Sequence, residues 1–263
     1  DTMLSAPVAA GPDGQVRTRM TPGTPPQPLA IADIKAINPP APAWKGSVKL
    51  TGLYTTGNSE TEQLGFTARL GKRWERDRFD AGAEYSYGRQ EDRDTGERST
   101  TIDFAAASMK YDHFFTPKFY GYGSLKAERD GVADLTLRFT PSAGVGYQWF
   151  EGPAFNLRTE AGVAWVYEDY DSSGSRDFFS GRLAYAGDWT PNPTLTLFHT
   201  LEYLPSLEDF TGDYLLNADA GLRARMWKRL FAEFKAEYRY DATPAPGREN
   251  ADTRYLLGLG WEF

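Results

Sequence analysis

The stretch DTRYLLGLGWEF, residues 252–263, indicates the fold class because its two faces differ sharply. Side chains alternate between the two sides of a strand, so every second residue shares a face. One face carries five large apolar residues: Tyr255, Leu257, Leu259, Trp261 and Phe263. The other face carries Arg254, Leu256, Gly258, Gly260 and Glu262. A strand with this pattern fits a barrel whose outside touches lipid.

Composition agrees with a membrane barrel and argues against several other classes. The 263 residues are 25% charged, their mean hydropathy is −0.55, and no apolar run approaches the roughly 20 residues of a membrane helix. A membrane strand escapes both tests because its apolar and polar residues alternate. The 16 Phe, 15 Tyr and 7 Trp are enough for aromatic girdles. The absence of cysteine excludes disulfides and cysteine-based sites, and the net charge of −7 argues against nucleic acid as a partner.

The sequence divides once, near residue 43. Residues 1–43 contain the Pro- and Gly-rich stretches GPDGQ, TPGTPPQP and most of NPPAPAW, which favour extended or irregular backbone. Between them, LAIADIKAIN can form a short helix at 29–38 because its apolar residues are near helical spacing. We therefore expect a periplasmic N-terminal extension over 1–43 and a barrel over 44–263. The extension is either a flexible leader or a segment that docks in the barrel mouth or on another protein.

From residue 44 onward, about twelve strand-like runs alternate with turn clusters. The runs lie near 44–55, 62–74, 78–90, 99–115, 119–129, 136–150, 155–168, 177–189, 195–204, 213–227, 230–241 and 252–263. Short connections such as TPK and TPNP alternate with longer, charged ones such as EDRDTGERS and ATPAPGRENAD. Outer-membrane barrels have short periplasmic turns and longer external loops. An even number of strands then places both termini in the periplasm.

The polar faces of these runs predict a wet interior. In the run 230–241, Glu233, Lys235, Glu237 and Arg239 alternate with apolar residues, and charges of both signs can pair there. We predict an all-β fold, a transmembrane, antiparallel, up-and-down barrel. The run 99–115 is irregular because the apolar residues at its two ends differ in parity. A β-bulge near Ala106 is expected to reconcile them.

The first hairpin, WKGSVKLTGLYTTGNSETEQLGFTARL at 44–70, carries a family resemblance. It resembles the opening of the salt-induced outer-membrane protein family, the YdiY-like barrels. The matching residues are Trp44, Gly46, Gly57, Asn58, Ser59 and Thr61. The last stretch is similar too, with a proline-containing loop, the pair Asp252-Thr253 and an aromatic terminus. The resemblance covers about 44–263 and implies an outer-membrane β-barrel, with no catalytic residues to carry over.

The apolar face of the last run suggests a role in assembly. Tyr255, Leu257, Leu259, Trp261 and Phe263 resemble the signal that barrel-assembly machinery recognises on its clients. This strand must also pair with the first one to close the barrel. The expected partners are therefore outer-membrane lipids and lipopolysaccharide, the assembly machinery during biogenesis, and an envelope protein bound through residues 1–43.

Charged residues at inward positions are the candidate functional residues. The predicted lumen-lining set is Arg138, Arg158, Glu160, Arg182, Asp219, Arg223, Arg225, Glu233, Lys235, Glu237 and Arg239. One interpretation is that these charges pair across neighbouring strands and fill the interior. The other is that they line a narrow aqueous path whose basic excess favours small anions.

Few residues suggest catalysis or metal binding. His199 shares parity with Leu197 and Leu201, so it could face lipid, as the histidine of an outer-membrane phospholipase does, but no serine motif accompanies it. The stretch DYDSSG at 169–174 resembles the start of a calcium loop, yet Ser180 stands where the distal glutamate belongs. We predict no enzyme activity, no metal and no cofactor. The sequence leaves three functions open: a structural or interaction barrel of the envelope, a narrow channel for small anionic solutes, and a lipid-face hydrolase, which is the least favoured.

Overall fold

The computed structural model describes residues 8–10, 16–18, 27–29, 43–55, 59–92 and 95–263. The chain forms two compact units, Asp1–Ala41 and Pro42–Phe263. The first contains three short strands, β1 Val8–Ala10, β2 Val16–Thr18 and β3 Gln27–Leu29, paired antiparallel in the order β1-β2-β3. Residues 30–38 of the predicted short helix lie outside the described residues, so that helix and the role of the extension stay predictions.

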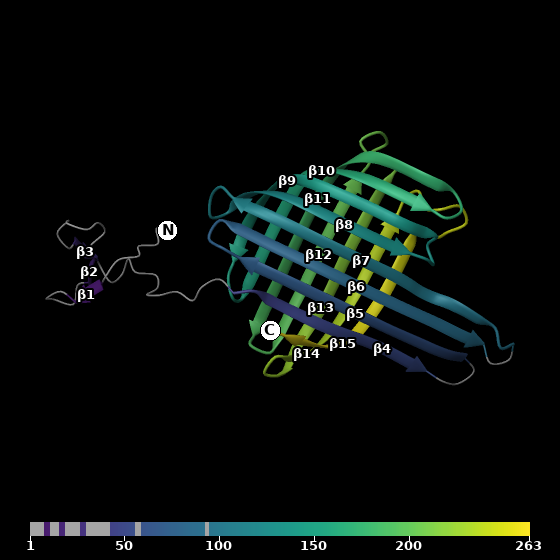
Figure 1. Cartoon of the computed structure of the whole chain (residues 1–263), viewed down its shortest axis with the longest axis horizontal. Coiled ribbons are helices and arrows are strands. Elements are labelled where there is room, and N and C mark those ends of the chain that lie inside the picture. Colours follow the sequence, from purple (N-terminus) through teal and green to yellow (C-terminus); the bar gives the residue numbers. More distant parts are fainter. Residues whose placement is uncertain (1–7, 11–15, 19–26, 30–42, 56–58, 93–94) are drawn as a thin grey trace. The chain divides into compact units, whose positions relative to one another are not determined.

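The second unit is a closed barrel of twelve antiparallel strands, β4 to β15, in which each strand pairs with its sequence neighbours and β15 pairs with β4 (Figure 1). The strands are β4 Lys45–Thr55, β5 Ser59–Arg73, β6 Asp77–Asp92, β7 Arg98–Phe114, β8 Phe119–Asp130, β9 Leu135–Glu151, β10 Phe155–Tyr170, β11 Gly174–Asn192, β12 Leu195–Pro205, β13 Tyr214–Trp227, β14 Leu230–Asp241 and β15 Ala251–Glu262. The predicted fold is confirmed. Closure removes the free sheet edges that could otherwise pair with other chains, except where two neighbouring strands pair over only part of their length.

Among the described residues, no helix has the length and apolar character needed to span a membrane.

The two ends of the barrel differ in the length of their connections. One end, here called the turn rim, carries the short connections 74–76, 115–118, 152–154, 193–194 and 228–229. The other end, the loop rim, carries the described connections 131–134, 171–173, 206–213 and 242–250. Both ends of the barrel sequence meet at the turn rim, because Gly46 N–H donates to Phe263 O (3.0 Å) and Phe263 N–H donates to Gly46 O (2.9 Å).

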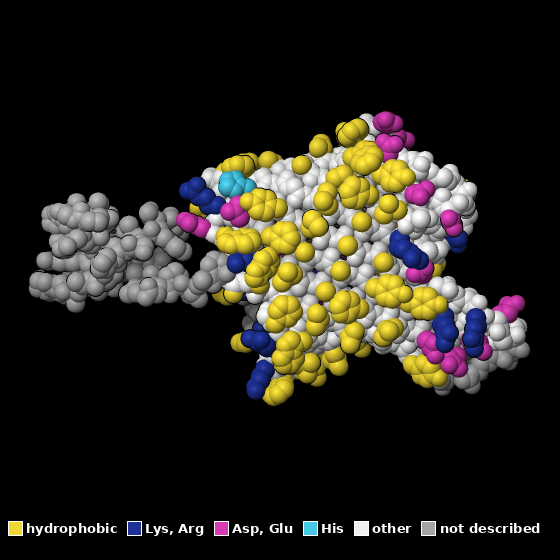
Figure 2. All heavy atoms as spheres, in the orientation of Figure 1, with side chains coloured by type: hydrophobic (Ala, Val, Ile, Leu, Met, Phe, Trp, Pro, Cys, Tyr) yellow, Lys and Arg dark blue, Asp and Glu magenta, His cyan; other side chains and the backbone are white. Residues whose placement is uncertain are grey.

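The outer face of the barrel is apolar between its two rims. Figure 2 shows hydrophobic side chains over the middle of the wall, with charged side chains gathered towards the ends. Tyr255 and Leu257 are 68% and 67% exposed, and Leu259, Trp261 and Phe263 lie on the same outer face. Exposing this much apolar surface to water would be unfavourable. A wall of this kind is suited to a lipid environment.

The prediction of a bulge near Ala106 is wrong. β7 pairs with β6 and β8 in continuous register through Ala106, and the irregularity lies instead where Gly88 pairs with Ile102 and Arg89 pairs with Thr100. Phe104 points inward, is only 7% exposed, and its ring lies 3.8 Å from the Arg254 guanidinium of β15. The predicted bulge would have placed the apolar residues at both ends of this run on the lipid side, whereas Phe104 helps to fill the interior.

The closing seam between β15 and β4 is short. Its residue pairs run only from Glu262↔Ser47 to Gly258↔Thr51, whereas β14 pairs with β15 from Trp261 to Ala251. Backbone bonds of an antiparallel strand alternate in direction, so Tyr255 and Leu257 direct their N–H and C=O groups to the same side as Phe263, which bonds Gly46 on β4. The last pair of this register, Gly258↔Thr51, is flanked by Leu257 and Leu259, so among the described residues Tyr255 lies beyond the paired part of the seam on that side.

We expect the amide proton of Tyr255 to exchange with solvent at least about tenfold faster than those of Leu259 and Trp261, because its N–H lies beyond the paired part of the seam and needs no opening step. Hydrogen exchange read by NMR in detergent micelles measures this. The amide of Leu222, a β13 residue with partners on both neighbouring strands, is the internal reference. Uniform protection along β15 would contradict the short seam.

Candidate functional site: the ion-paired interior of the barrel

The interior of the barrel is lined by charged side chains that pair with one another. The structure places the predicted lumen-lining residues in this network, each within 4.0 Å of an opposite charge: Arg138, Arg158, Glu160, Arg182, Asp219, Arg223, Arg225, Glu233, Lys235, Glu237 and Arg239. Strand alternation explains the placement, because these positions oppose the apolar outer face. Many of the pairs join strands that are not neighbours, and these pairs cross the interior at three levels.

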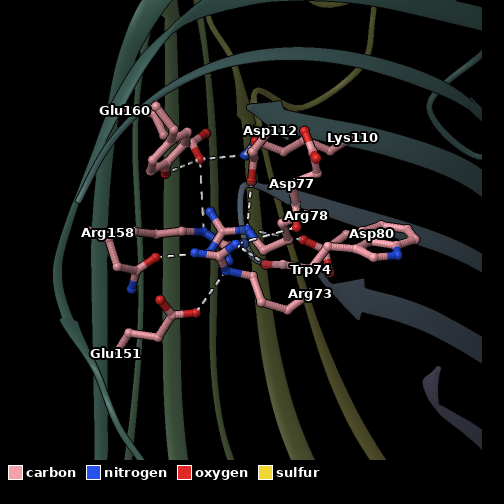
Figure 3. Close-up of polar contacts among 12 residues, drawn as sticks. Arg73, Trp74, Asp77, Arg78, Asp80, Lys110, Asp112, Glu151, Arg158 and Glu160 are labelled. Atoms are coloured by element: carbon pink, nitrogen blue, oxygen red, sulfur yellow. Dashed lines mark hydrogen bonds and ion pairs between the residues drawn. The ribbon is translucent and has the colours of Figure 1, made fainter. Parts of the chain in front are cut away.

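The first level lies near the turn rim and joins β5 to β9 (Figure 3). Arg73 of β5 donates from Nε to Glu151 Oε1 of β9 (3.2 Å), although three strands separate these two in the wall. Arg78 of β6 donates to Asp112 (2.6 Å) and to Gln148 of β9 (2.8 Å). The Arg73 guanidinium also lies 3.9 Å from the ring centroid of Phe114, a favourable cation–π geometry. Long side chains therefore span the barrel just inside this rim.

Glu160 of β10 organises the middle of the interior. It accepts a hydrogen bond from Tyr120 Oη (2.9 Å) and one from Arg182 Nη1 (2.9 Å), and Lys110 Nζ of β7 lies 2.7 Å away. Tyr120 is fully buried because Gly146 leaves room for its ring. A buried carboxylate without such partners would be strongly destabilising. Glu160 is thus a fixed junction between three other strands.

On the opposite side of the middle level, β14 reaches across to β4 and β6. Lys49 Nζ donates to Glu233 Oε1 (2.6 Å), and Lys235 Nζ donates to Glu84 Oε2 of β6 (3.2 Å). Three strands lie between β14 and β6 in the wall. Lys235 is 1% exposed and also pairs with Glu237. Water therefore has little access to this part of the interior.

The third level closes the interior near the loop rim. Arg138 of β9 donates to Glu168 (2.5 Å) and Glu128 (3.3 Å), and it also pairs with Asp241 at the end of β14. Four strands separate β9 from β14. The Tyr170 hydroxyl donates to the same Asp241 carboxylate (3.2 Å). Arg138 is thus the hub of a cross-lumen contact.

The connections at the loop rim reinforce this closure. Ala245 of the last connection is buried in one cluster with Leu135 and Tyr170. Asp134 accepts hydrogen bonds from the backbone N–H (3.0 Å) and the hydroxyl of Ser172, and these bonds lower the pKa of the Asp134 carboxyl. Arg248 lies 4.0 Å from the same carboxylate. Three loops are therefore tied to one another over the barrel mouth.

An apolar cluster inside the barrel was not predicted from the sequence. Ala164, Val166, Phe178, Leu204 and Leu215 pack together with low exposure. A signal was present, because Ala164 and Val166 have the same parity as Glu160 on β10. The alternation of side chains predicts which residues face inward, but it does not predict whether part of the interior is an apolar cluster that excludes water.

A cavity with a volume of about 260 Å³ lies among the charged side chains. It is lined by Lys110, Lys126, Arg158, Glu160, Arg182, Ala184, Tyr185, Ala186, Thr200, Leu201, Glu202, Asn217, Asp219 and Arg239. A second cavity of about 20 Å³ shares Lys126, Glu202 and Asn217 with it and reaches Arg138. The open volume inside the barrel is therefore smaller near Arg138, towards the loop rim, than in the middle.

The two histidines lie on the outer face of the barrel or at its rim. The His199 Nδ1 atom is 2.5 Å from the Tyr185 hydroxyl, and the two rings stack at 5.3 Å. By strand register His199 is flanked by Gly187 and Ala220, so this pairing offers no serine nucleophile. His113 Nδ1 lies 2.9 Å from Asp77 near the turn rim. In the described part of the chain, no group of three or more His, Asp or Glu side chains could hold a metal ion.

A closed twelve-stranded sheet with an apolar outside and a charged, ion-paired inside defines the class of protein: an outer-membrane-type β-barrel. The predicted strand count, the even closure and the polar interior all belong to that class. The family model described as "Protein of unknown function, DUF481" matches residues 48–263. The chain therefore belongs to this family, which includes the salt-induced outer-membrane proteins, and the predicted resemblance is confirmed.

Solved structures of similar shape are outer-membrane barrels of several kinds. They include the NanC porin (10% identity, 83% of this chain and 99% of that chain, TM-score 0.49). An outer-membrane channel from Pseudomonas putida F1 is similar at 12% identity, over 89% of this chain and 100% of that chain, with a TM-score of 0.48. The translocator domain of the autotransporter NalP from Neisseria meningitidis is 16% identical over 84% of this chain and 87% of that chain, with a TM-score of 0.42. No curated protein matches the chain.

Gly146 is required by the close approach of Tyr120. A Cβ atom at position 146 would lie 2.3 Å from Tyr120 Cζ, whereas one at Gly123 would meet nothing within 4 Å. We expect Gly146→Ala to lower the free energy of unfolding by about 1–3 kcal/mol, because the ring that bonds Glu160 must move. Gly123→Ala is the matched control and should be near neutral. Urea unfolding in detergent micelles measures both, and equal effects would refute the packing argument.

Proposed function

We propose that this chain is a structural and interaction barrel of the outer membrane whose lumen is closed by its own side chains. The observation that carries the proposal is the set of contacts between strands that are not neighbours, at three levels: Arg73–Glu151, Lys235–Glu84 and Arg138–Asp241. Buried ion pairs contribute modest net stability, but removing one partner leaves an uncompensated charge and is costly. The network therefore favours this closed arrangement over a wide, water-filled bore.

The same proposal includes an orientation and a set of partners. The turn rim would face the periplasm, as short turns do in this class, and both Gly46 and Phe263 lie at that rim. Residues 1–43 would then be available to an envelope protein, and the five outer residues from Tyr255 to Phe263 would be presented to the assembly machinery. A cysteine-reactive dye tests the orientation: Lys228→Cys at the turn rim should react only after the outer membrane is permeabilised. Labelling of intact cells would reverse the assignment.

Planar lipid bilayers test the closed lumen. The native chain should show no large, stable conductance steps, while Arg73→Ala, Lys235→Ala and Arg138→Ala combined should conduct, because the crossing side chains are shortened at all three levels. The matched control combines Arg89→Ala, Arg98→Ala and Arg129→Ala, which removes three exposed ion pairs outside the lumen. Large steps from the native chain, or equal behaviour of both variants, would overturn the proposal.

A narrow path for small anions is the second candidate function. It is favoured by the five basic against three acidic side chains that line the 260 Å³ cavity, since such a lining attracts anions. In the same recordings, this function requires small steps with an anion-selective reversal potential under a salt gradient. Arg223→Glu should then shift the selectivity towards cations. Absence of conductance with and without residues 1–43 would remove this candidate.

A further inference from the structure

The 260 Å³ cavity exists because short side chains line part of its wall. On β11, Ala184 and Ala186 follow Arg182, and Thr200 faces the same space from β12. Long basic side chains from β8, β10 and β14 surround them: Lys126, Arg158 and Arg239. A water molecule occupies about 30 Å³ in the liquid, so the cavity is large enough for a small hydrated solute.

The carboxylates of this cavity are already engaged by other groups. Glu160 is bonded by Tyr120, Arg182 and Lys110. Arg182 Nε donates to Glu202 Oε1 (2.7 Å), and Asn217 Nδ2 donates to Glu202 Oε2 (3.3 Å). Asp219 Oδ1 accepts from Arg239 Nη1 (2.8 Å). The acidic side chains therefore have little capacity left to neutralise a further cation.

Two arginines that line this space have guanidinium donors without an acceptor among the described residues. The closest carboxylate to Arg158 is Glu160, whose Oε1 is 3.8 Å from Arg158 Nε and already has closer partners. The Arg158 side chain is 31% exposed, and no hydrogen bond joins it to the described residues. Arg239 Nε is buried and likewise has no hydrogen-bond partner among them. A buried donor without an acceptor is unfavourable, so an acceptor supplied by a solute would stabilise the site.

We propose that this cavity is a binding site for a small solute that carries a carboxylate or phosphate group, held by Arg158 with help from Arg239 and Lys126. The planar guanidinium matches the two oxygens of either group in a bidentate arrangement. The lining carries two more basic than acidic side chains, which compensates one or two negative charges. The site goes beyond the structural role proposed above and does not require that the solute cross the membrane.

Isothermal titration calorimetry of the full chain in a non-ionic detergent tests this site. The probes are inorganic phosphate and glucuronate, with uncharged glucose as the control, at constant ionic strength. We expect one saturable site for each anion and no heat of binding for glucose. Arg158→Ala should weaken anion binding at least tenfold, and Arg158→Lys should recover part of the loss because the charge returns without the planar fork.

The matched control is Arg69→Ala, which removes the same charge from an inward position on β5 that does not line the cavity. It should change the dissociation constant less than twofold. Because Arg158 has one long ion pair among the described residues, its substitution should leave the fold intact, as heat-dependent mobility on a gel can verify. Absence of saturable binding at millimolar phosphate, or equal losses for Arg69→Ala and Arg158→Ala, would overturn the proposal whatever the bilayer recordings show.

Discussion

The constraint on which the structure depends is that backbone N–H and C=O groups cannot be left unpaired in hydrocarbon. Twelve strands meet it by closing into a barrel, with Gly46 bonded to Phe263 at the turn rim. Closure fixes which side of every strand faces lipid. The residues on the other side must then share one confined space, and opposite charges in that space have to find one another. The cross-lumen network is therefore a consequence of closure as much as of the individual residues.

Much of the fold could be predicted from the sequence because the alternation of side chains between the two faces of a strand is a local property. Most strands of this barrel show a period of two, and the alternation of short and long connections indicates which end of each strand lies at which rim. The assumption that apolar residues face lipid failed at Phe104, which packs inside the barrel against Arg254. A strand sequence states which residues share a face, and it does not state that every apolar face is an outer one.

Less of the interior could be predicted. The charges were visible, but their partners were not, since Arg138 and Asp241 lie on strands separated by four others. Such contacts depend on the bore and cross-section of the barrel, and no local pattern encodes either. The cavity is a further example: it results from Ala184, Ala186 and Thr200 lying opposite long basic side chains. Only the assembled wall shows that Arg158 shares its nearest described carboxylate, Glu160, with closer partners.

The short β4–β15 seam has a consequence for how the barrel forms. Its five residue pairs join the two ends of the barrel sequence, so this contact has the longest loop to close and the fewest bonds to hold it. Strands that are neighbours in the sequence should pair first, as local hairpins, and β4 should pair with β15 last. We therefore expect the pairing of Gly46 with Phe263 to form last and slowly during folding. In unfolding, β4 and β15 should separate first, beginning at the loop rim.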